Sequence, residues 1–111
     1  MRGLWLELYI LEWETNKVIP VPEYAIPETR FIEWATWMHH NRDRCRVGYD
    51  TVGQYEVSTV FIGSWGNIFE TMVFDSLSTR HALDQQRAAT WDEAVANHTR
   101  LVNQYRVMVS G

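Results

Sequence analysis

One histidine in the last third of the 111-residue chain is the clearest candidate for chemistry. His98 lies on the apolar stripe of a predicted helix, between Val95 on one side and Leu101 on the other. The simplest interpretation is a core histidine with one hydrogen bond. The alternative is a buried polar group that lines a pocket with polar side chains of the predicted strands, namely Ser58, Thr59, Glu70 and Thr71. A small enzyme using His98 and Glu70 in acid–base catalysis is a further hypothesis.

Glu70 lies inside an otherwise apolar stretch, next to Thr71. Two neighbouring carboxylates could divide the roles of acid and base, but Glu70 has no second carboxylate beside it in the strand interior. We therefore expect a glutamate that faces solvent. The serines and threonines lack a glycine-flanked nucleophile turn, and the chain has no glycine-rich phosphate loop, so no catalytic residue is assigned.

A metal site could be drawn from four dispersed residues, His39, His40, Cys45 and His81. Their spacing matches no closed zinc pattern, which pairs ligands two to four residues apart on both sides. Adjacent residues of a helix point about 100° apart, so His39 and His40 are poorly placed to share one ion. We expect ordinary histidines at a helix end, with neither a metal nor a cofactor.

The single cysteine, Cys45, is flanked by Arg44 and Arg46. A catalytic thiol needs a positioned base and electropositive surroundings. Neighbours on a strand point to the opposite face, so the arginines would not surround the sulfur. We expect a buried structural thiol. A lone cysteine also forms no internal disulfide, which is typical of a reducing, cytoplasmic compartment.

Exposed aromatic residues are the candidate binding surface. Trp65 is predicted at a hairpin tip, and Trp37 lies off the apolar stripe of its helix, close in sequence to Arg42 and Arg44. Trp and Arg often dominate binding energy, with each anchor contributing about 2 kcal/mol or more. The alternative is that Trp65 folds back over its own hairpin and that Trp37 fills a gap between helix and sheet.

These residues need a scaffold, and hydrophobic periodicity predicts its elements. Alternating patterns favour strands at 4–13, 45–52, 55–63 and 68–75, with a short further strand at 85–89. Residues 18–21 form an edge strand or an extended arm, because Pro20 and Pro22 exclude a central position. Helical periodicity predicts helices at 28–40 and 91–106, the second opened by a capping box of Thr90 and Glu93.

These elements predict one α+β domain spanning residues 1–111. Its antiparallel meander has about four to five strands, and both helices pack on it. The strand at 4–13 is expected to extend the sheet built around residues 45–75.

Composition narrows the possible partners. The net charge is −4 and no long basic run exists, which disfavours direct binding to nucleic acid. No stretch approaches the roughly 18 apolar residues of a membrane span, and we expect no signal peptide. Six Trp residues and a first strand that is apolar on both faces predict a homodimer or larger oligomer.

Two specific strings stand out, YEVSTVFIG at 55–63 and FETMVF at 69–74, followed by TWDEA at 90–94 and then His98. These segments resemble a family of small, uncharacterised proteins encoded by bacteriophages and prophages. Weaker likeness covers Val21-Pro22, 34–37 and 44–51. Family members carry a longer loop between the two strands, rich in Asp, His, Gly and Pro, whereas this chain has only 64–67 there. The resemblance implies no established activity.

The resemblance implies an accessory protein that acts by binding in the cytoplasm of a bacterial host. It would inhibit a host defence or regulatory protein, or sequester a small, nucleotide-like signal molecule. A self-associating interaction module of a phage complex is the alternative.

Overall fold

Four strands that follow one another along the chain form an antiparallel sheet in the order β3–β4–β5–β6. They are β3 (Arg46–Val52), β4 (Tyr55–Ser64), β5 (Asn67–Asp75) and β6 (Asp84–Ala88). The computed structural model describes residues 7–22, 26–64, 66–78 and 82–111. The predicted meander is confirmed, and together with the helices it gives the predicted α+β fold.

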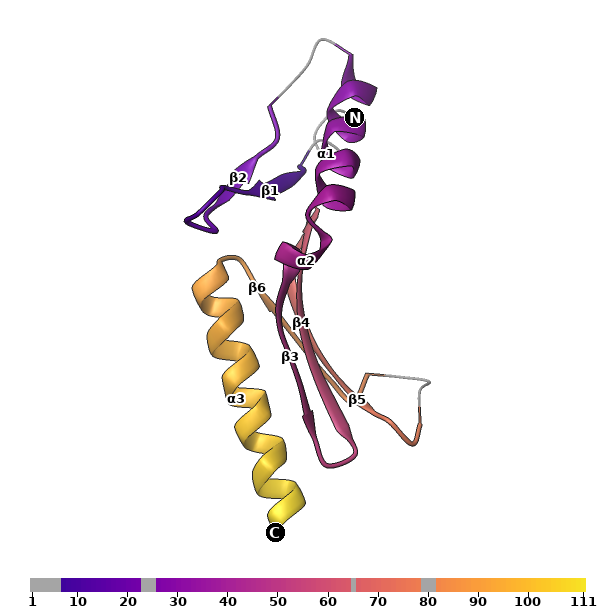
Figure 1. Cartoon of the computed structure of the whole chain (residues 1–111), viewed down its shortest axis with the longest axis vertical. Helices are drawn as coiled ribbons and strands as arrows, with labels where there is room; N and C mark the ends of the chain where they lie inside the picture. Colours follow the sequence, from indigo (N-terminus) through magenta and orange to yellow (C-terminus); the bar gives the residue numbers. More distant parts are fainter. Residues whose placement is uncertain (1–6, 23–25, 65, 79–81) are drawn as a thin grey trace.

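Helix α3 (Trp91–Ser110) lies along one face of this sheet and contacts all four strands (Figure 1). The predicted capping box opens it. The backbone N–H of Glu93 donates to Oγ1 of Thr90 at 3.2 Å, and the Glu93 carboxylate accepts from the backbone N–H of Ala89 at 3.2 Å. Val95, predicted on the apolar stripe, is instead 42% exposed, because the buried stripe follows other positions: Ala94, His98, Leu101, Val102 and Tyr105.

The core between α3 and the sheet has two apolar clusters. One surrounds Val57 and Leu101, and the other surrounds Phe61 and Phe69. Strand alternation places a threonine between the clusters on each central strand, Thr59 on β4 and Thr71 on β5. A band of polar side chains therefore crosses the middle of the helix–sheet interface.

A separate two-stranded antiparallel sheet lies beyond one end of the meander. It pairs β1 (Tyr9–Leu11) with β2 (Val18–Pro20). The expected extension of the main sheet by the strand at 4–13 is therefore wrong for its described part. That segment forms its ladder with β2, and an isolated bridge between Leu8 and Ser64 connects it to the main sheet, while Leu11 packs in the core cluster of Phe61 and Phe69.

Gly63 permits this junction between the two sheets. The β4–β5 register shifts between Phe61 and Ser64, which bends the end of β4 toward β1. Gly63 has φ of +68°, and a Cβ there would lie 2.6 Å from the carbonyl oxygen of Tyr9. A larger residue would be strained and would push the hairpin away.

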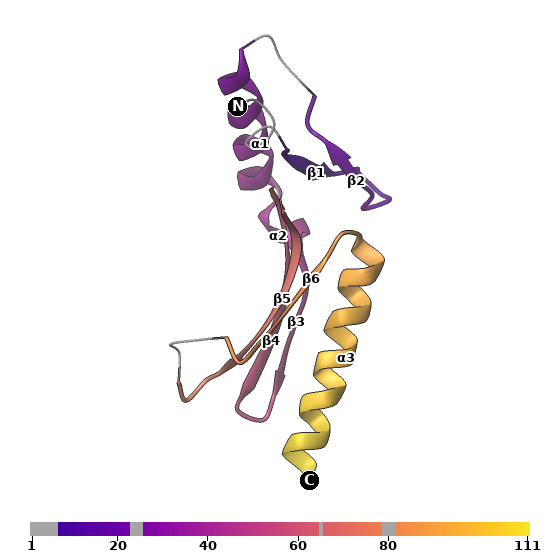
Figure 2. The ribbon, with the colours of Figure 1, turned by 180° about the vertical axis from the view of Figure 1, so that it is seen from behind.

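Helix α1 (Pro27–His40) lies beyond the sheet rather than on it (Figures 1 and 2). The expected packing of this helix on the sheet holds for its C-terminal half, while its main contacts are with β1 and with the short helix α2 (Arg42–Cys45). Only its C-terminal half reaches the core, through Trp37 and Met38. Asn41 caps the end of α1, and its backbone N–H donates to the Trp37 carbonyl at 2.9 Å.

The molecule is elongated, with principal extents of 56 × 31 × 23 Å. Its radius of gyration is 15.9 Å. A compact domain of this length has a value of about 13 Å. The difference arises because α1 and the β1–β2 hairpin extend from one end of the sheet (Figure 1). Within the described ranges, no helix is both long and apolar enough to cross a bilayer.

The sheet face opposite α3 carries several apolar side chains. Strand alternation directs Val60 and Ile62 of β4, and Met72 and Phe74 of β5, toward this face, where each is partly exposed. Neither of the long helices α1 and α3 covers this face in the described part of the chain (Figure 2), and the short α2 adjoins it near Val60. We call it the open face.

Candidate functional site

Four side chains form a hydrogen-bonded chain across the helix–sheet interface. Nε2 of His98 lies 2.7 Å from Oδ2 of Asp50 on β3. Nδ1 of the same ring lies 2.7 Å from Oγ1 of Thr59, which lies 2.7 Å from Oγ1 of Thr71. The structure therefore brings together three residues that the sequence had suggested for a pocket, namely His98, Thr59 and Thr71.

The direction of these hydrogen bonds follows from donor and acceptor chemistry. An ionised Asp50 only accepts, so Nε2 of His98 carries the hydrogen. In a neutral ring Nδ1 then accepts from the Thr59 hydroxyl, and Thr59 accepts in turn from Thr71. Every buried polar atom between the strands and the ring obtains a partner, which removes the cost of burying it.

Gly48 makes room for the imidazole. It pairs with Thr59 across β3 and β4, directly beneath the ring. A Cβ on Gly48 would lie 2.9 Å from Nε2 of His98 and 3.0 Å from two ring carbons. The absence of a side chain here lets the helix residue sit flat against the edge strand and reach Asp50.

An acid–imidazole–hydroxyl series resembles the machinery of hydroxyl nucleophiles. Here, however, the hydroxyl end is inaccessible, since Thr59 has 0% of its surface exposed. The acid end is the open one, because the Asp50 side chain is 48% exposed. A substrate cannot reach Thr59, so the network serves to hold α3 on the sheet. Sequence reasoning missed Asp50, whose only signal was a charged residue in the predicted strand at 45–52.

Glu70 does not join this network. It neighbours Thr71 on β5, so its side chain points to the open face, as does that of Ser58 on β4. The expectation that Glu70 faces solvent is also wrong, because only 9% of it is exposed. Gln85 donates a hydrogen bond to its carboxylate, and the Arg87 guanidinium lies 3.7 Å away. These two β6 side chains shield Glu70.

Cys45 is buried, as predicted, at the end of α2. Burial raises the pKa of its thiol, and the nearby Arg44 guanidinium offsets this only in part. Its sulfur lies 4.0 Å from that of Met38. A raised pKa keeps the sulfur in the protonated, unreactive form.

The histidines at the end of α1 are exposed, and their ring centroids are 5.6 Å apart. Among the described residues, no group of three or more potential ligands could hold a metal ion. His81, the remaining histidine considered for such a cluster, lies outside the described residues.

Trp37 follows the alternative interpretation of the candidate aromatic surface. Trp37 is half-buried and packs edge-on against Phe61, with ring centroids 6.0 Å apart. It fills the gap between helix and sheet. Arg42 is exposed at the start of α2. Trp65 lies outside the described residues, so its predicted role stays a prediction.

Arg44 holds the β1–β2 turn instead of facing a partner. Its guanidinium lies 4.9 Å from the ring centre of Trp13 and 5.8 Å from that of Trp37. It also donates hydrogen bonds to the backbone carbonyl of Glu12 at 3.0 Å and to Oδ1 of Asn16 at 3.2 Å. A cation between two indoles thus joins the hairpin turn to α2.

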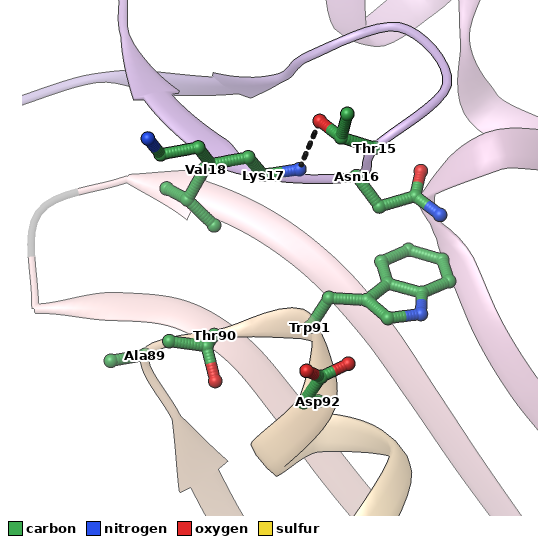
Figure 3. Close-up of a pocket in the computed structure, with 8 residues that line it drawn as sticks. All are labelled: Thr15, Asn16, Lys17, Val18, Ala89, Thr90, Trp91 and Asp92. Atoms are coloured by element: carbon green, nitrogen blue, oxygen red, sulfur yellow. Dashed lines mark hydrogen bonds between the residues drawn. The ribbon is translucent and has the colours of Figure 1, made fainter.

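A cavity of about 460 Å³ lies between this turn and the start of α3 (Figure 3). Residues 15–18 form one wall and residues 89–92 form the other. The indole of Trp91 rises from the helix toward Asn16, and the Asp92 carboxylate lies next to it. An edge-on contact with Phe69, at a centroid distance of 6.2 Å, supports the indole from the core side.

The lining combines features of a small-ligand site. Its volume is within the range of about 300–1,000 Å³ common to such sites. Trp91 and Val18 give apolar surface. The polar groups of the lining are already hydrogen-bonded, since the Thr15 hydroxyl donates to Glu12, the Thr90 hydroxyl caps α3 and Oδ1 of Asn16 accepts from Arg44. Each of the two hydroxyls can still accept one further hydrogen bond from a ligand. One ammonium and one carboxylate, those of Lys17 and Asp92, balance each other in charge. This lining suits a small, flat, uncharged molecule better than a phosphate.

Comparisons of the chain with protein-family models, with curated proteins and with solved structures find no match.

Proposed function

We propose that this protein acts by binding rather than by catalysis, and that it sequesters a small planar heteroaromatic molecule. The observation that carries the proposal is the cavity between the β1–β2 turn and α3, with the Trp91 indole in its α3 wall. Base–aromatic stacking contributes about 1–3 kcal/mol per base, and neighbouring hydroxyl and amide groups can select the edge of a ring.

The resemblance to phage and prophage proteins gives this binding a biological context. A signal molecule of the bacterial host, with a nucleobase-like ring, is the class of ligand we propose. Capture would take place in the host cytoplasm, where the free thiol of Cys45 would remain reduced.

A panel of nucleosides and their monophosphates tests this proposal. We expect neutral nucleosides to raise the thermal unfolding temperature, since a ligand at about 100 times its dissociation constant adds roughly 2.7 kcal/mol of stability. Monophosphates should bind no more tightly than nucleosides, because the Lys17 ammonium and the Asp92 carboxylate leave the lining without a net positive charge for the phosphate. Calorimetric titration then gives the affinity.

Variants of the cavity wall make the test specific. Trp91→Phe and Thr15→Ala should each weaken nucleoside binding while the fold is retained. Asp43→Asn, which changes an exposed carboxylate on α2, is the matched control and should bind normally. If no nucleoside stabilises the protein, or if the wall variants bind as well as the control, sequestration at this cavity is wrong.

Inhibition of a host protein is the second candidate function. It is favoured by the open face, where Val60, Ile62, Met72 and Phe74 are partly exposed. A solvated face of an antiparallel sheet is more often polar. Replacing Met72 by Lys should abolish capture of a host protein if this face binds it, whereas the cavity variants should leave such capture unchanged.

A further inference from the structure

The outer face of α1 carries a regular stripe of residues. Glu28, Ile32, Ala35 and His39 are spaced four, three and four residues apart, which places them on one side of a helix. Phe31 flanks the stripe. Ile32 is 61% exposed and Phe31 is 54% exposed, so large apolar side chains stand in solvent.

This stripe faces away from the rest of the described chain. The opposite side of α1 carries Arg30, which is buried and donates to the Val21 carbonyl at 2.9 Å, and Trp37, which reaches the core. Met38, on the flank beside Phe31, reaches the core as well. The packing of the described monomer therefore does not use the outer face of α1. Exposed apolar side chains gathered on one helix face mark an interaction surface.

The order of residues along the stripe identifies its partner. We propose that a second copy of this chain packs antiparallel on α1, about a two-fold axis passing between residues 33 and 34. This register places Ile32 opposite the partner's Ala35 and Glu28 opposite the partner's His39. Each contact occurs twice because of the symmetry, so one stripe is complementary to itself.

Each pair in this register is favourable in its own way. A large side chain, Ile32, meets a small one, the partner's Ala35, so the two helices can interdigitate closely. The carboxylate of Glu28 accepts a hydrogen bond from the imidazole of the partner's His39. The acidic first turn of one helix also lies beside the last turn of the other, so the antiparallel dipoles attract. A parallel arrangement would place Glu28 against its own copy.

The location of α1 agrees with this assembly. It extends from one end of an elongated molecule, where it is reachable by a second copy (Figures 1 and 2). The ligand cavity is lined by residues 15–18 and 89–92 and uses no residue of α1. The dimer is therefore independent of the proposed ligand, and either conclusion can fail without the other.

Sedimentation or light scattering at micromolar concentration tests the interface. We expect the wild type to be a dimer, and Ile32→Glu to raise the dissociation constant by about 100-fold or more because two carboxylates would be buried unpaired. Val107→Glu is the matched control. It adds the same charge at an apolar residue on α3 that is 71% exposed, and it should stay dimeric.

A charge exchange tests the antiparallel register without altering the apolar contact. Glu28→Lys and His39→Glu should each weaken the dimer, by about 2- to 10-fold, as expected for exposed pairs that occur twice. The double variant should recover wild-type affinity, because the lysine introduced at position 28 then pairs with the glutamate introduced at position 39 of the other copy, on both sides of the axis. Circular dichroism confirms that each variant is folded.

Three results would overturn the proposal. They are a monomeric wild type, a dimer that Ile32→Glu leaves intact, and a double variant no tighter than its single parents. The first would mean that the stripe on α1 does not bind a second copy of this chain. The second would move the interface to another surface, such as the open face, and the third would exclude the antiparallel register.

Discussion

Asp50 and His98 are 48 positions apart in the chain, yet Oδ2 of one and Nε2 of the other lie 2.7 Å apart. This contact joins an edge strand to the middle of α3. It also fixes the tautomer of the neutral ring. Nε2 carries the hydrogen, so Nδ1 is the acceptor for the Thr59 hydroxyl. The orientation of one ring therefore links β3, β4, β5 and α3.

The first prediction concerns the threonine at the centre of the network. Thr59→Val keeps the shape of the side chain but leaves Nδ1 of His98 and the hydroxyl of Thr71 without this partner. We expect a loss of about 1–3 kcal/mol in the free energy of unfolding, the cost of leaving buried polar groups unpaired. Denaturant unfolding measures it.

Thr51→Val is the matched control for this substitution. Thr51 is an exposed residue of β3, so the change should be within about 0.5 kcal/mol of neutral. Equal effects of the two substitutions would mean that the hydrogen bonds of Thr59 contribute nothing to stability.

The second prediction concerns the close approach at Gly48. An added Cβ would lie 2.9 Å from Nε2 of His98, so Gly48→Ala must displace the ring or the strand. We expect a cost of about 1–3 kcal/mol, as for other overpacked sites. In a His98→Ala background the ring is gone, so the same substitution should cost much less. A double-mutant cycle measures this coupling, and additive effects would contradict it.

Local patterns predicted the meander, both long helices and the capping box because these depend on near neighbours in sequence. Hydrophobic periods of two residues in strands and about 3.6 residues in helices predict that Val57 and Leu101 face the core, without reference to distant parts of the chain. Turn residues and the Thr90 cap mark where the elements begin. The contact of Thr59 with His98 was predicted only as one alternative, a shared pocket, because both residues occupy inward positions of predicted elements.

Long-range packing explains what sequence reasoning missed. Nothing near Asp50 in the sequence indicates a histidine 48 positions away. The segment around Leu8 alternates as a sheet strand does, but its partner is β2, which follows it directly along the chain, and not a strand of the main sheet. Trp37 lies off its helix stripe and is nevertheless half-buried, because Phe61 faces it from another element.

The third prediction concerns the reactivity of Cys45. Burial raises the pKa of its thiol, so a smaller fraction is thiolate at any pH below that value than for a free cysteine. We expect a disulfide reagent at mildly alkaline pH to modify the native protein far more slowly than the protein unfolded in guanidinium. Equal rates would show that the thiol is accessible and ionises normally.

The fourth prediction concerns Arg44, which joins the hairpin turn to α2. Lysine retains the charge but loses the planar group that lies near both Trp13 and Trp37, and it cannot reproduce the two hydrogen bonds to Glu12 and Asn16 with the same geometry. Arg44→Lys should therefore free the turn, and amide hydrogen exchange of residues 12–18 should accelerate while that of α3 stays unchanged.

The same substitution should affect the ligand cavity, because residues 15–18 form one of its walls. A loosened wall must be ordered again on binding, so Arg44→Lys should reduce nucleoside affinity even though Arg44 is outside that wall. Arg42→Lys, at an exposed position of the same short helix, is the control and should change neither exchange nor binding. If Arg44→Lys also behaves like wild type in both measurements, the stacked arginine does not hold the turn, and the cavity wall is ordered by the β1–β2 ladder alone.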